Sequence, residues 1–419
     1  MGRTSKADVW TFGMEDGVLS QRPLLMVGLT AFVLVGVGEA GAQSTRQPEA
    51  GRMCWPTSAL AARGGENRIE KGRAQAYQPL PRGKVRMRPP LPWRSGGRVV
   101  RRVNLPPGQK FVAFTFDLCE QPYEISGYQG DIVDFLRREK VPATFFAGGK
   151  WIVSHRARAQ QIMSDPLFEI GNHAWEHRNF QVLPVARMHP EIAGSQLAYQ
   201  HAYDDLKRRA CLARDRRVAY RNAKPRQMLF RFPFGACNRD AIEAVEKYGL
   251  LAIQWDVSSS DPWTGQSVAG MVKTVMRQVK PGSIVLFHAN GRGWKTGAAL
   301  PTLVRRLRAD GYRFVTVSKL LTLGKPEYVD RCYDFRPGDV DRYKTLSRRL
   351  EAAYDRFYVK FGKTRPSAKS MPRTGPVPAA RRESGGWKTK TNQAKPQDVT
   401  SPPPPRPKLL REAPIRPRE

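Results

Sequence analysis

The sequence predicts an α/β protein built on parallel strands, either a barrel or a doubly wound sheet. Three observations lead to this prediction. Short apolar runs recur between residues 111 and 325, stretches with helical periodicity separate most of them, and polar residues end five of the runs. Buried strands that alternate with amphipathic helices are typical of βα units, whose strands lie parallel.

Seven apolar runs are predicted to be strands. They are Phe111–Asp117 (FVAFTFD), Ala143–Gly149 (ATFFAGG), Phe168–His173 (FEIGNH), Leu229–Gly235 (LFRFPFG), Leu250–Val257 (LLAIQWDV), Ser283–Ala289 (SIVLFHA) and Arg313–Val317 (RFVTV). Helical spacing precedes two of them, at Ile132, Val133 and Leu136 and at Leu303, Val304 and Leu307. Beyond the last run, helical spacing recurs at Leu346, Leu350, Ala353, Tyr354 and Phe357. This last pattern predicts one extra helix packed on the outside.

An uncharged apolar run of fifteen residues lies near the N-terminus, at Leu24–Gly38. Arg22 precedes the run and Ala40-Gly-Ala42 follows it, which is typical of a secretory signal cleaved after Ala42. A spanning helix needs about 20 apolar residues, so the run is short for one, but an uncleaved anchor stays an alternative. In both cases we expect the body of the protein to be exported, to the periplasm, the cell envelope or the extracellular space.

The basic residues concentrate outside the predicted strands. The chain has 71 Lys and Arg against 37 Asp and Glu, a formal net charge of +34. Residues 43–110 hold fifteen Lys or Arg and three Glu, and residues 363–419 hold fourteen Lys or Arg, four acids and twelve prolines. We therefore expect two extended, disordered basic flanks. Their role is either solvation or adhesion to an anionic cell-envelope surface.

The expected organisation has five parts. These are a signal peptide or anchor (1–42), a basic Pro-rich lead-in (43–110), a catalytic domain (111–325), an extension with one helix (326–362) and a basic disordered tail (363–419). The five cysteines are too dispersed for a disulfide-built mini-domain or a CxxC metal site. Their odd number leaves at least one thiol unpaired in a monomer, the expected state.

Polar residues end five of the predicted strands, at Asp117, His173-Ala-Trp-Glu-His177, Arg231-Phe-Pro-Phe-Gly235, Asp256 to Asp261, and His288. Chemistry collects at the carboxyl ends of parallel strands, so these residues are candidates for one site. His173 and His177 lie four apart, which on a helical turn puts both rings on one face, as a shared metal ion requires. With Glu176 they also form H-x-x-E-H, the inverted zinc-protease signature, which needs a helix.

Taken together, the five motifs resemble those of polysaccharide deacetylases of the nodulation-protein-B type, carbohydrate esterase family 4. The matching strings are Thr115-Phe-Asp117, His173 to His177, Arg231 to Gly235, Asp256 to Trp263, and Leu286-Phe-His288, with the flanking string Val141-Pro-Ala-Thr-Phe-Phe146. The resemblance covers about residues 112–321. It implies a distorted β/α barrel, a divalent metal, and hydrolysis of N-acetyl groups on an amino-sugar polymer or oligomer.

The resemblance also implies a role for each site residue. Asp117 would be the general base, paired with Arg231, and His288 would be the general acid, oriented by Asp261. His173 and His177 would hold the metal, which we expect to be zinc, with cobalt, manganese or nickel as alternatives. Phe234 would supply a backbone N–H to the oxyanion, and Trp263 and Leu286 would wall the acetyl slot, unless they are ordinary core residues.

One position departs from the family. The family usually has Asp-Asp in its first motif, the second aspartate being the third metal ligand, whereas this sequence reads Asp117-Leu118. Leucine cannot coordinate a metal, so we expect water, Glu120 or Glu124 in that position. Three alternatives to a deacetylase remain: a non-catalytic glycan-binding descendant, a zinc protease, and, most remotely, a nucleic-acid binder, which we do not expect.

Overall fold

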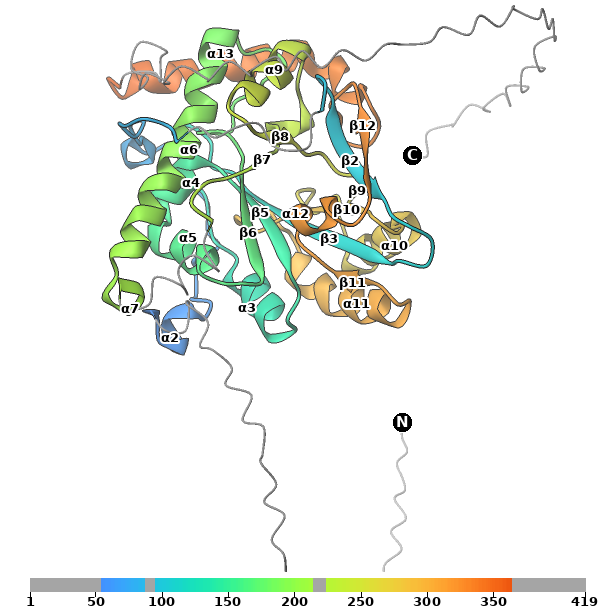
Figure 1. Ribbon diagram of the computed structural model, residues 1–419. Helices are drawn as coiled ribbons and strands as arrows, with labels where there is room; N and C mark the ends of the chain where they lie inside the picture. The colour runs from blue at the N-terminus through green and yellow to red at the C-terminus, as the bar shows by residue number, and fades with distance from the viewer. Residues whose placement is uncertain (1–53, 87–94, 214–223, 364–419) are drawn as a thin grey trace, which may run out of the picture. The chain divides into compact units, whose positions relative to one another are not determined.

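Eight strands form one parallel sheet that curls into a distorted barrel in the computed structural model, which describes residues 54–86, 95–213 and 224–363 (Figure 1). In spatial order they are β8 (Leu251–Ala252), β7 (Leu229–Phe230), β6 (Phe168–Asn172), β5 (Ala143–Ala147), β3 (Phe111–Leu118), β10 (Ile284–His288) and β9 (Val257–Ser258). An eighth strand, β11 (Arg313–Phe314), pairs with the start of β3. The predicted distorted barrel of about seven parallel strands is confirmed.

One predicted strand is wrong in extent. The run Leu250–Val257 splits into β8 and β9, which lie at opposite edges of the sheet. The residues between them leave the sheet, because the backbone N–H of Gln254 donates to Val100 and that of Asp256 donates to Ile284. The segment between β8 and β9 therefore runs from one edge of the sheet to the other, across the gap where these two edge strands do not pair.

Alternate residues of each strand serve two apolar layers. Phe114, Phe116 and Leu118 pack outward in the large cluster that includes helix residues, whereas Ala113 packs in a different cluster with Phe146. Side chains alternate between the faces of a strand, so Asp117 shares the inner face with Ala113. The same alternation in β10 places His288 inside the barrel.

Helices cover the outer face of the sheet. They are α3 (Gly130–Arg138), α4 (Gly149–Ser154), α5 (Arg156–Met163), α6 (Val185–Arg208), α7 (Ala210–Ala213), α9 (Arg239–Lys247), α10 (Val268–Gln278) and α11 (Thr296–Ala309). Helix α12 (Val317–Leu321) instead packs in the same apolar cluster as Ala113 and Phe146. The apolar positions predicted for α3 and α11 are all buried. Three helices start at a side-chain cap, from Asn238, Ser267 and Thr316.

Much of the expected lead-in is packed on the barrel, so its expected extended character is wrong for residues 54–86 and 95–110. These residues contain α2 (Thr57–Leu60), β1 (Glu70–Lys71), the 3-10 turn η1 (Ala74–Ala76) and β2 (Val99–Asn104). β1 pairs with β4 (Glu124–Ile125). Buried Arg158 explains part of the order, because its guanidinium donates to the carbonyl oxygens of residues 59–61 and to the carboxylate of Glu66.

The extension after residue 325 contains β12 (Lys325–Val329), the 3-10 turn η3 (Asp339–Tyr343) and α13 (Lys344–Lys360). β12 pairs antiparallel with β2, and the predicted extra helix is α13 (Figure 1). Its predicted apolar face is only partly buried, because Tyr354 and Phe357 are buried but Leu346 is 63% exposed.

Two disulfides, Cys54–Cys211 and Cys237–Cys332, tie distant parts of the chain, and Cys119 is the free thiol expected from the odd count. The predicted signal segment and the basic tail lie outside the described residues, apart from Lys363. Within the described residues, no helix is long and apolar enough to cross a membrane.

Candidate active site

A buried ion pair joins the ends of two strands at the centre of the site. Asp117 ends the inner face of β3, and Arg231 directly follows β7. Nη1 of Arg231 donates to Oδ1 of Asp117 over 2.9 Å and to the hydroxyl of Thr115 over 2.8 Å. The guanidinium also lies over the ring of Phe146 at 4.0 Å. The predicted pairing of Arg231 with Asp117 is therefore present.

His173 follows β6 and lies beside Asp117. Its Nδ1 is 2.9 Å from the carbonyl oxygen of Arg231, and its Nε2 is 3.5 Å from Oδ2 of Asp117. A carbonyl only accepts, so Nδ1 carries the proton and Nε2 presents a lone pair. Burial lowers the pKa of His173 and keeps the ring neutral, which is the form that binds a metal.

His177 comes near His173 through a loop, so the predicted helical turn is wrong. Ala174 and His177 have left-handed φ angles of 65° and 59°, and these bends bring the two ring centroids to 5.0 Å. Nε2 of His173 and Nδ1 of His177 are buried and have no hydrogen-bond partner among the described residues. Buried polar nitrogens without partners are costly, so the pair fits a site for a cation.

Cys119 completes the group, which the sequence analysis missed. A ligand atom from each of Cys119, His173 and His177 lies within 4.8 Å of the others, and all three residues are buried. Leu118 points into the outer apolar layer. Cys119 lies two residues after Asp117 and lines the same cavity. The amide nitrogen of Asn290 donates to its sulfur over 3.0 Å.

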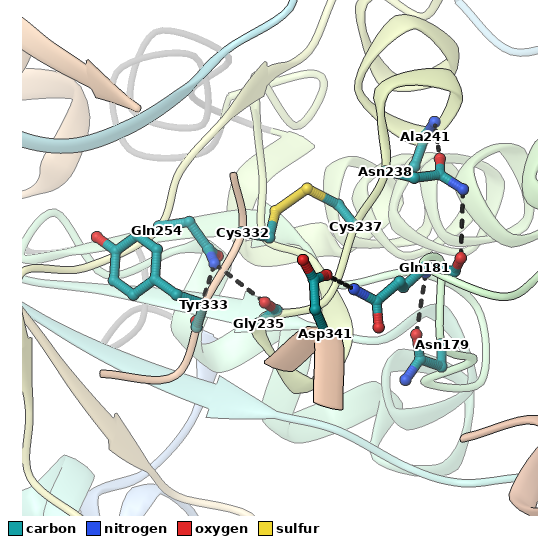
Figure 2. Close-up of a disulfide and its surroundings, with 10 residues drawn as sticks. All are labelled: Asn179, Gln181, Gly235, Cys237, Asn238, Ala241, Gln254, Cys332, Tyr333 and Asp341. Atoms are coloured by element: carbon teal, nitrogen blue, oxygen red, sulfur yellow. Dashed lines mark hydrogen bonds between the residues drawn. A yellow bond between two sulfur atoms is a disulfide. The ribbon is translucent and has the colours of Figure 1, made fainter. Parts of the chain in front are cut away.

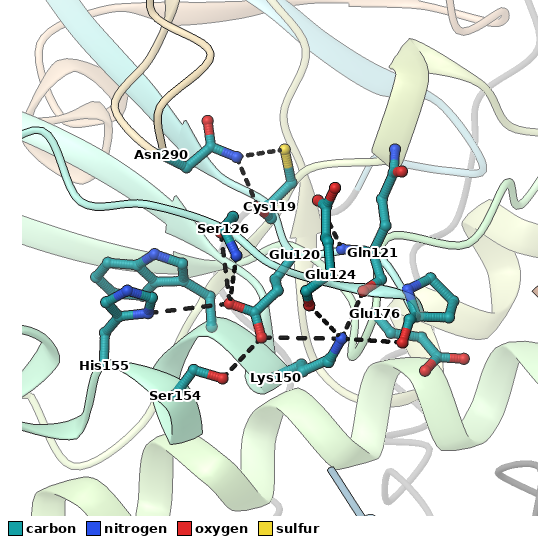
Figure 3. A network of polar contacts seen from close by, with 12 residues as sticks. Cys119, Glu120, Gln121, Glu124, Ser126, Lys150, Ser154, His155, Glu176 and Asn290 are labelled. Carbon is teal, nitrogen blue, oxygen red and sulfur yellow. Dashed lines mark hydrogen bonds and ion pairs between the residues drawn. The ribbon is translucent and has the colours of Figure 1, made fainter. Parts of the chain in front are cut away.

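The two glutamates considered as third ligand are engaged elsewhere (Figure 3). Glu120 accepts hydrogen bonds from Ser126 and Ser154 and lies 3.9 Å from the ammonium group of Lys150. Glu124 accepts a bond from Nη2 of Arg292 over 2.7 Å. Neither belongs to the group of possible ligands, and both carboxylates already have hydrogen-bond partners.

The zinc-protease alternative loses its structural basis. Its signature requires a helix, but residues 173–177 form a loop. Glu176 accepts hydrogen bonds from Arg178 and from the hydroxyl of Tyr358, and the ammonium group of Lys150 lies nearby in Figure 3. Glu176 therefore has structural partners and is absent from the lining of the cavity that Asp117 and His288 share.

His288 lies in register beside Asp117, because β10 pairs with β3. Its Nδ1 is 2.8 Å from Oδ1 of Asp261, and its backbone N–H donates to Oδ2 of the same carboxylate over 2.7 Å. Burial alone would lower the pKa of His288, but the charge of Asp261 and its hydrogen bond outweigh burial and raise the pKa above its ordinary value. The predicted orientation of His288 by Asp261 is present.

Several of these groups line one cavity of about 780 Å³. Asp117, Cys119, His177 and His288 line it, and so do the three residues expected to bind substrate, Phe234, Trp263 and Leu286. Trp263 is 64% exposed, so it is not a core residue, whereas Leu286 is nearly buried at 6%. Phe234 has a left-handed φ of 59° and stacks edge-on against His177.

Residues 104–253 match the family model for polysaccharide deacetylases. This part of the chain is similar to polysaccharide deacetylases. The matched residues include Asp117, His173, His177 and Arg231 and end before Asp261 and His288. The resemblance inferred from the five motifs is therefore confirmed.

Three curated proteins are similar to this chain. A peptidoglycan-N-acetylglucosamine deacetylase of Bacillus cereus is 29% identical over 220 residues, which are 52% of this chain and 91% of the relative. A chitooligosaccharide deacetylase of Bradyrhizobium is 29% identical over 181 residues, 43% of this chain and 71% of the relative. A peptidoglycan-N-acetylglucosamine deacetylase of Listeria monocytogenes is 28% identical over 53% of this chain, but only 42% of its own length is covered.

Among solved structures, a CE4 family pseudoenzyme from Bacillus anthracis matches with 22% identity and a TM-score of 0.42, over 54% of this chain and 70% of that one. A family 4 acetyl xylan esterase from Clostridium thermocellum matches with 23% identity and a TM-score of 0.41, over 51% of this chain and 91% of that one.

Proposed function

We propose that the protein is a metal-dependent hydrolase that removes N-acetyl groups from an amino-sugar polymer or oligomer, such as peptidoglycan, a chitooligosaccharide or an exopolysaccharide. The observation that carries the proposal is the placement of Asp117 and His288. They lie in register on neighbouring strands, and both line a cavity with His177. The deacetylase names of the curated relatives support the same reaction.

The site residues fit a divalent metal. We infer that His173, His177 and Cys119 hold it, since two unpartnered imidazole nitrogens and a sulfur converge in a buried place. Thiolate and imidazole are the donors that zinc prefers, and catalytic zinc sites use three protein ligands and keep one position open. An ion there would supply Lewis acidity toward the acetyl carbonyl and ease the deprotonation of water.

Asn290 would position the sulfur ligand. Its amide also donates to the carbonyl oxygen of Cys119 over 2.6 Å, so the amide plane is fixed relative to the loop. Groups that hydrogen-bond to a ligand orient it and tune its affinity. Burial raises the pKa of the Cys119 thiol to about 12, so metal binding must displace a proton from the sulfur.

The acid and base act on opposite stages of the reaction. Asp117, held through Oδ1 by Arg231, would take a proton from the attacking water with Oδ2. His288, held by Asp261 through Nδ1, would give a proton from Nε2 to the departing amine. An amine leaves poorly without that proton. The backbone N–H at Phe234 would donate to the oxyanion, and Trp263 and Leu286 would wall the acetyl methyl.

We also propose export, which the two disulfides support because disulfides persist in oxidising compartments. Adhesion of the basic flanks to an anionic envelope surface and a monomeric state belong to the same proposal. The part boundaries at residues 42, 110, 325 and 362 stay predictions.

Acetate release from a panel of acetylated glycans tests the proposed function. The protein is loaded with zinc, and parallel samples receive cobalt, manganese or nickel. Release from at least one amino-sugar polymer is expected. Tight glycan binding without release under any of the four metals would favour the non-catalytic descendant.

A further inference from the structure

The cavity has a second wall that lies outside the predicted catalytic domain. Six residues of the extension, between positions 334 and 347, line the same cavity as Asp117 and His288. The lining includes the side chains of Phe335, Tyr343 and Leu346. The cleft is therefore built from both parts of the chain.

This wall is apolar and open to solvent. Phe335 is 55% exposed, Tyr343 is 47% exposed and Leu346 is 63% exposed, and Trp263 of the barrel borders the same cavity. We call Phe335, Tyr343 and Leu346 the extension wall. Single exposed apolar side chains are ordinary, but a cluster of them around one cavity marks a binding surface.

The backbone under the extension wall is fixed. The carboxylate of Asp339 accepts hydrogen bonds from the backbone N–H groups of Asp334, Phe335 and Arg336, at 2.8 to 3.0 Å. The indole of Trp255 donates to the carbonyl oxygen of Asp334 over 2.7 Å. Phe335 therefore projects from an ordered turn.

A disulfide ties this turn to the third motif (Figure 2). Cys332 is bonded to Cys237, two residues after Gly235. The amide of Gln254 donates to the carbonyl oxygen of Tyr333 over 3.2 Å. A Cβ atom at Gly235 would lie 2.2 Å from that same oxygen. Only a glycine at this position therefore lets the backbone of the extension pack against the third motif.

Helix α13 fastens the other end of the extension wall. The carboxylate of Glu351 accepts hydrogen bonds from the guanidinium of Arg178 and from the backbone N–H of Asn179, and the amide of Asn179 donates to Ser347. Arg178 and Asn179 directly follow His177. The wall and the loop of the candidate metal ligands are thus held by one network.

We propose that the extension wall binds further sugar rings of an extended amino-sugar chain, next to the ring whose acetyl group lies at Asp117. This inference rests on the proposed function and names the preferred substrate as a chain of several sugars. The apolar C–H faces of a sugar ring can cover the rings of Phe335 and Tyr343, and its hydroxyl groups stay in water or reach the carboxylate of Asp334. Because the wall is already fixed, little ordering free energy is lost on binding.

The test compares amino-sugar oligomers of two, four and six units. The variants are Phe335→Ala, Tyr343→Ala and the double variant in the full chain. The matched control is Val359→Ala, an apolar residue that is 79% exposed on α13 but does not line the cavity. For the hexamer, KM should rise about threefold to tenfold for each ring removed, and the rise should be smaller for shorter oligomers. Val359→Ala should match the parent protein.

A second measurement separates this inference from the proposed function. Calorimetry of the hexamer on the Asp117→Asn background reports binding without turnover, with and without the two ring substitutions. Binding that depends on the rings supports the wall even if no glycan is deacetylated. Turnover with an equal KM change at all lengths, or with none, would overturn the wall and leave the proposed function standing.

Discussion

Asp117 and Arg231 form a buried ion pair: Nη1 of Arg231 lies 2.9 Å from Oδ1 of Asp117, and the arginine is fully buried. The guanidinium fixes one carboxylate oxygen and leaves Oδ2 toward His173, at 3.5 Å from its Nε2. A carboxylate held in this way has one oxygen free to accept a proton.

Asp117→Asn should lower turnover about 100-fold or more, because an amide has the shape of the carboxylate but cannot accept the proton. His288→Ala should cause a loss of similar size for lack of the acid. Acetate release under saturating substrate measures both. The control is Asp310→Asn at an exposed site, which should keep the parent rate. Near-normal rates in both site variants would favour the binding-protein alternative.

Cys119→Ala and His173→Ala should each weaken zinc binding by about tenfold or more, since even changes in the groups behind a ligand have effects of this size. Competition with a chromophoric chelator measures the affinity. With cobalt in place of zinc, the parent protein should show a sulfur-to-cobalt absorption band that Cys119→Ala lacks. Glu120→Gln is the matched control for a buried side chain near Cys119. Retention of the band without Cys119 would exclude the sulfur as a ligand.

Zinc affinity should rise with pH, because the buried thiol holds its proton up to a pKa of about 12 without metal and must release it on binding. Calorimetry in buffers of different ionisation enthalpy counts the released protons. We expect Cys119→Ala to release fewer than the parent. An equal number in both proteins would show that the sulfur stays protonated.

The alkaline limb of the pH–rate profile should follow His288. The acid form is needed for the amine, so activity falls as pH rises through its pKa, which Asp261 holds above the ordinary value. Asp261→Asn removes the raising charge, so the limb should move to lower pH, and turnover should fall through loss of orientation. An alkaline limb at the same pH in Asp261→Asn and in the parent protein would show that another group causes the limb.

Glu351 of α13 binds Arg178 and Asn179, and we call these contacts the α13 clamp. Loss of the clamp should weaken the fold near the loop that carries His173 and His177. Glu351→Ala leaves the buried Arg178 with fewer charged partners, which should cost about 2 kcal/mol of unfolding free energy. Arg348→Ala, at an exposed position of the same helix, should have little effect. Thermal melts compare the two. Equal stability of both variants would show that the clamp adds nothing.

The sequence was sufficient for the parts of the fold with strong local signals. The runs at β3, β5 and β10 have apolar residues on both faces, because helices cover one side and the barrel interior lies on the other. Polar residues that end such runs lie at the carboxyl ends of the strands, where sites of parallel sheets form, so Asp117 and His288 could be placed. Sequence spacing alone also suggested His173 and His177, although the local conformation is a loop and not a helix.

The rest depends on contacts between distant residues. Cys119 belongs to none of the five motifs. It becomes a candidate metal ligand only because it lies beside the rings of His173 and His177, which are more than fifty positions away in the chain. Residues 54–86 look loose because they are basic and rich in small residues, but Arg158 and the disulfide Cys54–Cys211 hold them. Leu346 fits a helical apolar face, yet that face borders an open cavity at its first turn.

The most direct test of the central claim is the joint measurement of acetate and new primary amine from an N-acetylglucosamine oligomer treated with zinc-loaded protein. The account predicts equal amounts of the two products, dependent on zinc and reduced at least 100-fold in Asp117→Asn. Acetate production by Asp117→Asn at the parent rate, or the absence of both products with every amino-sugar oligomer and polymer tried, would contradict it.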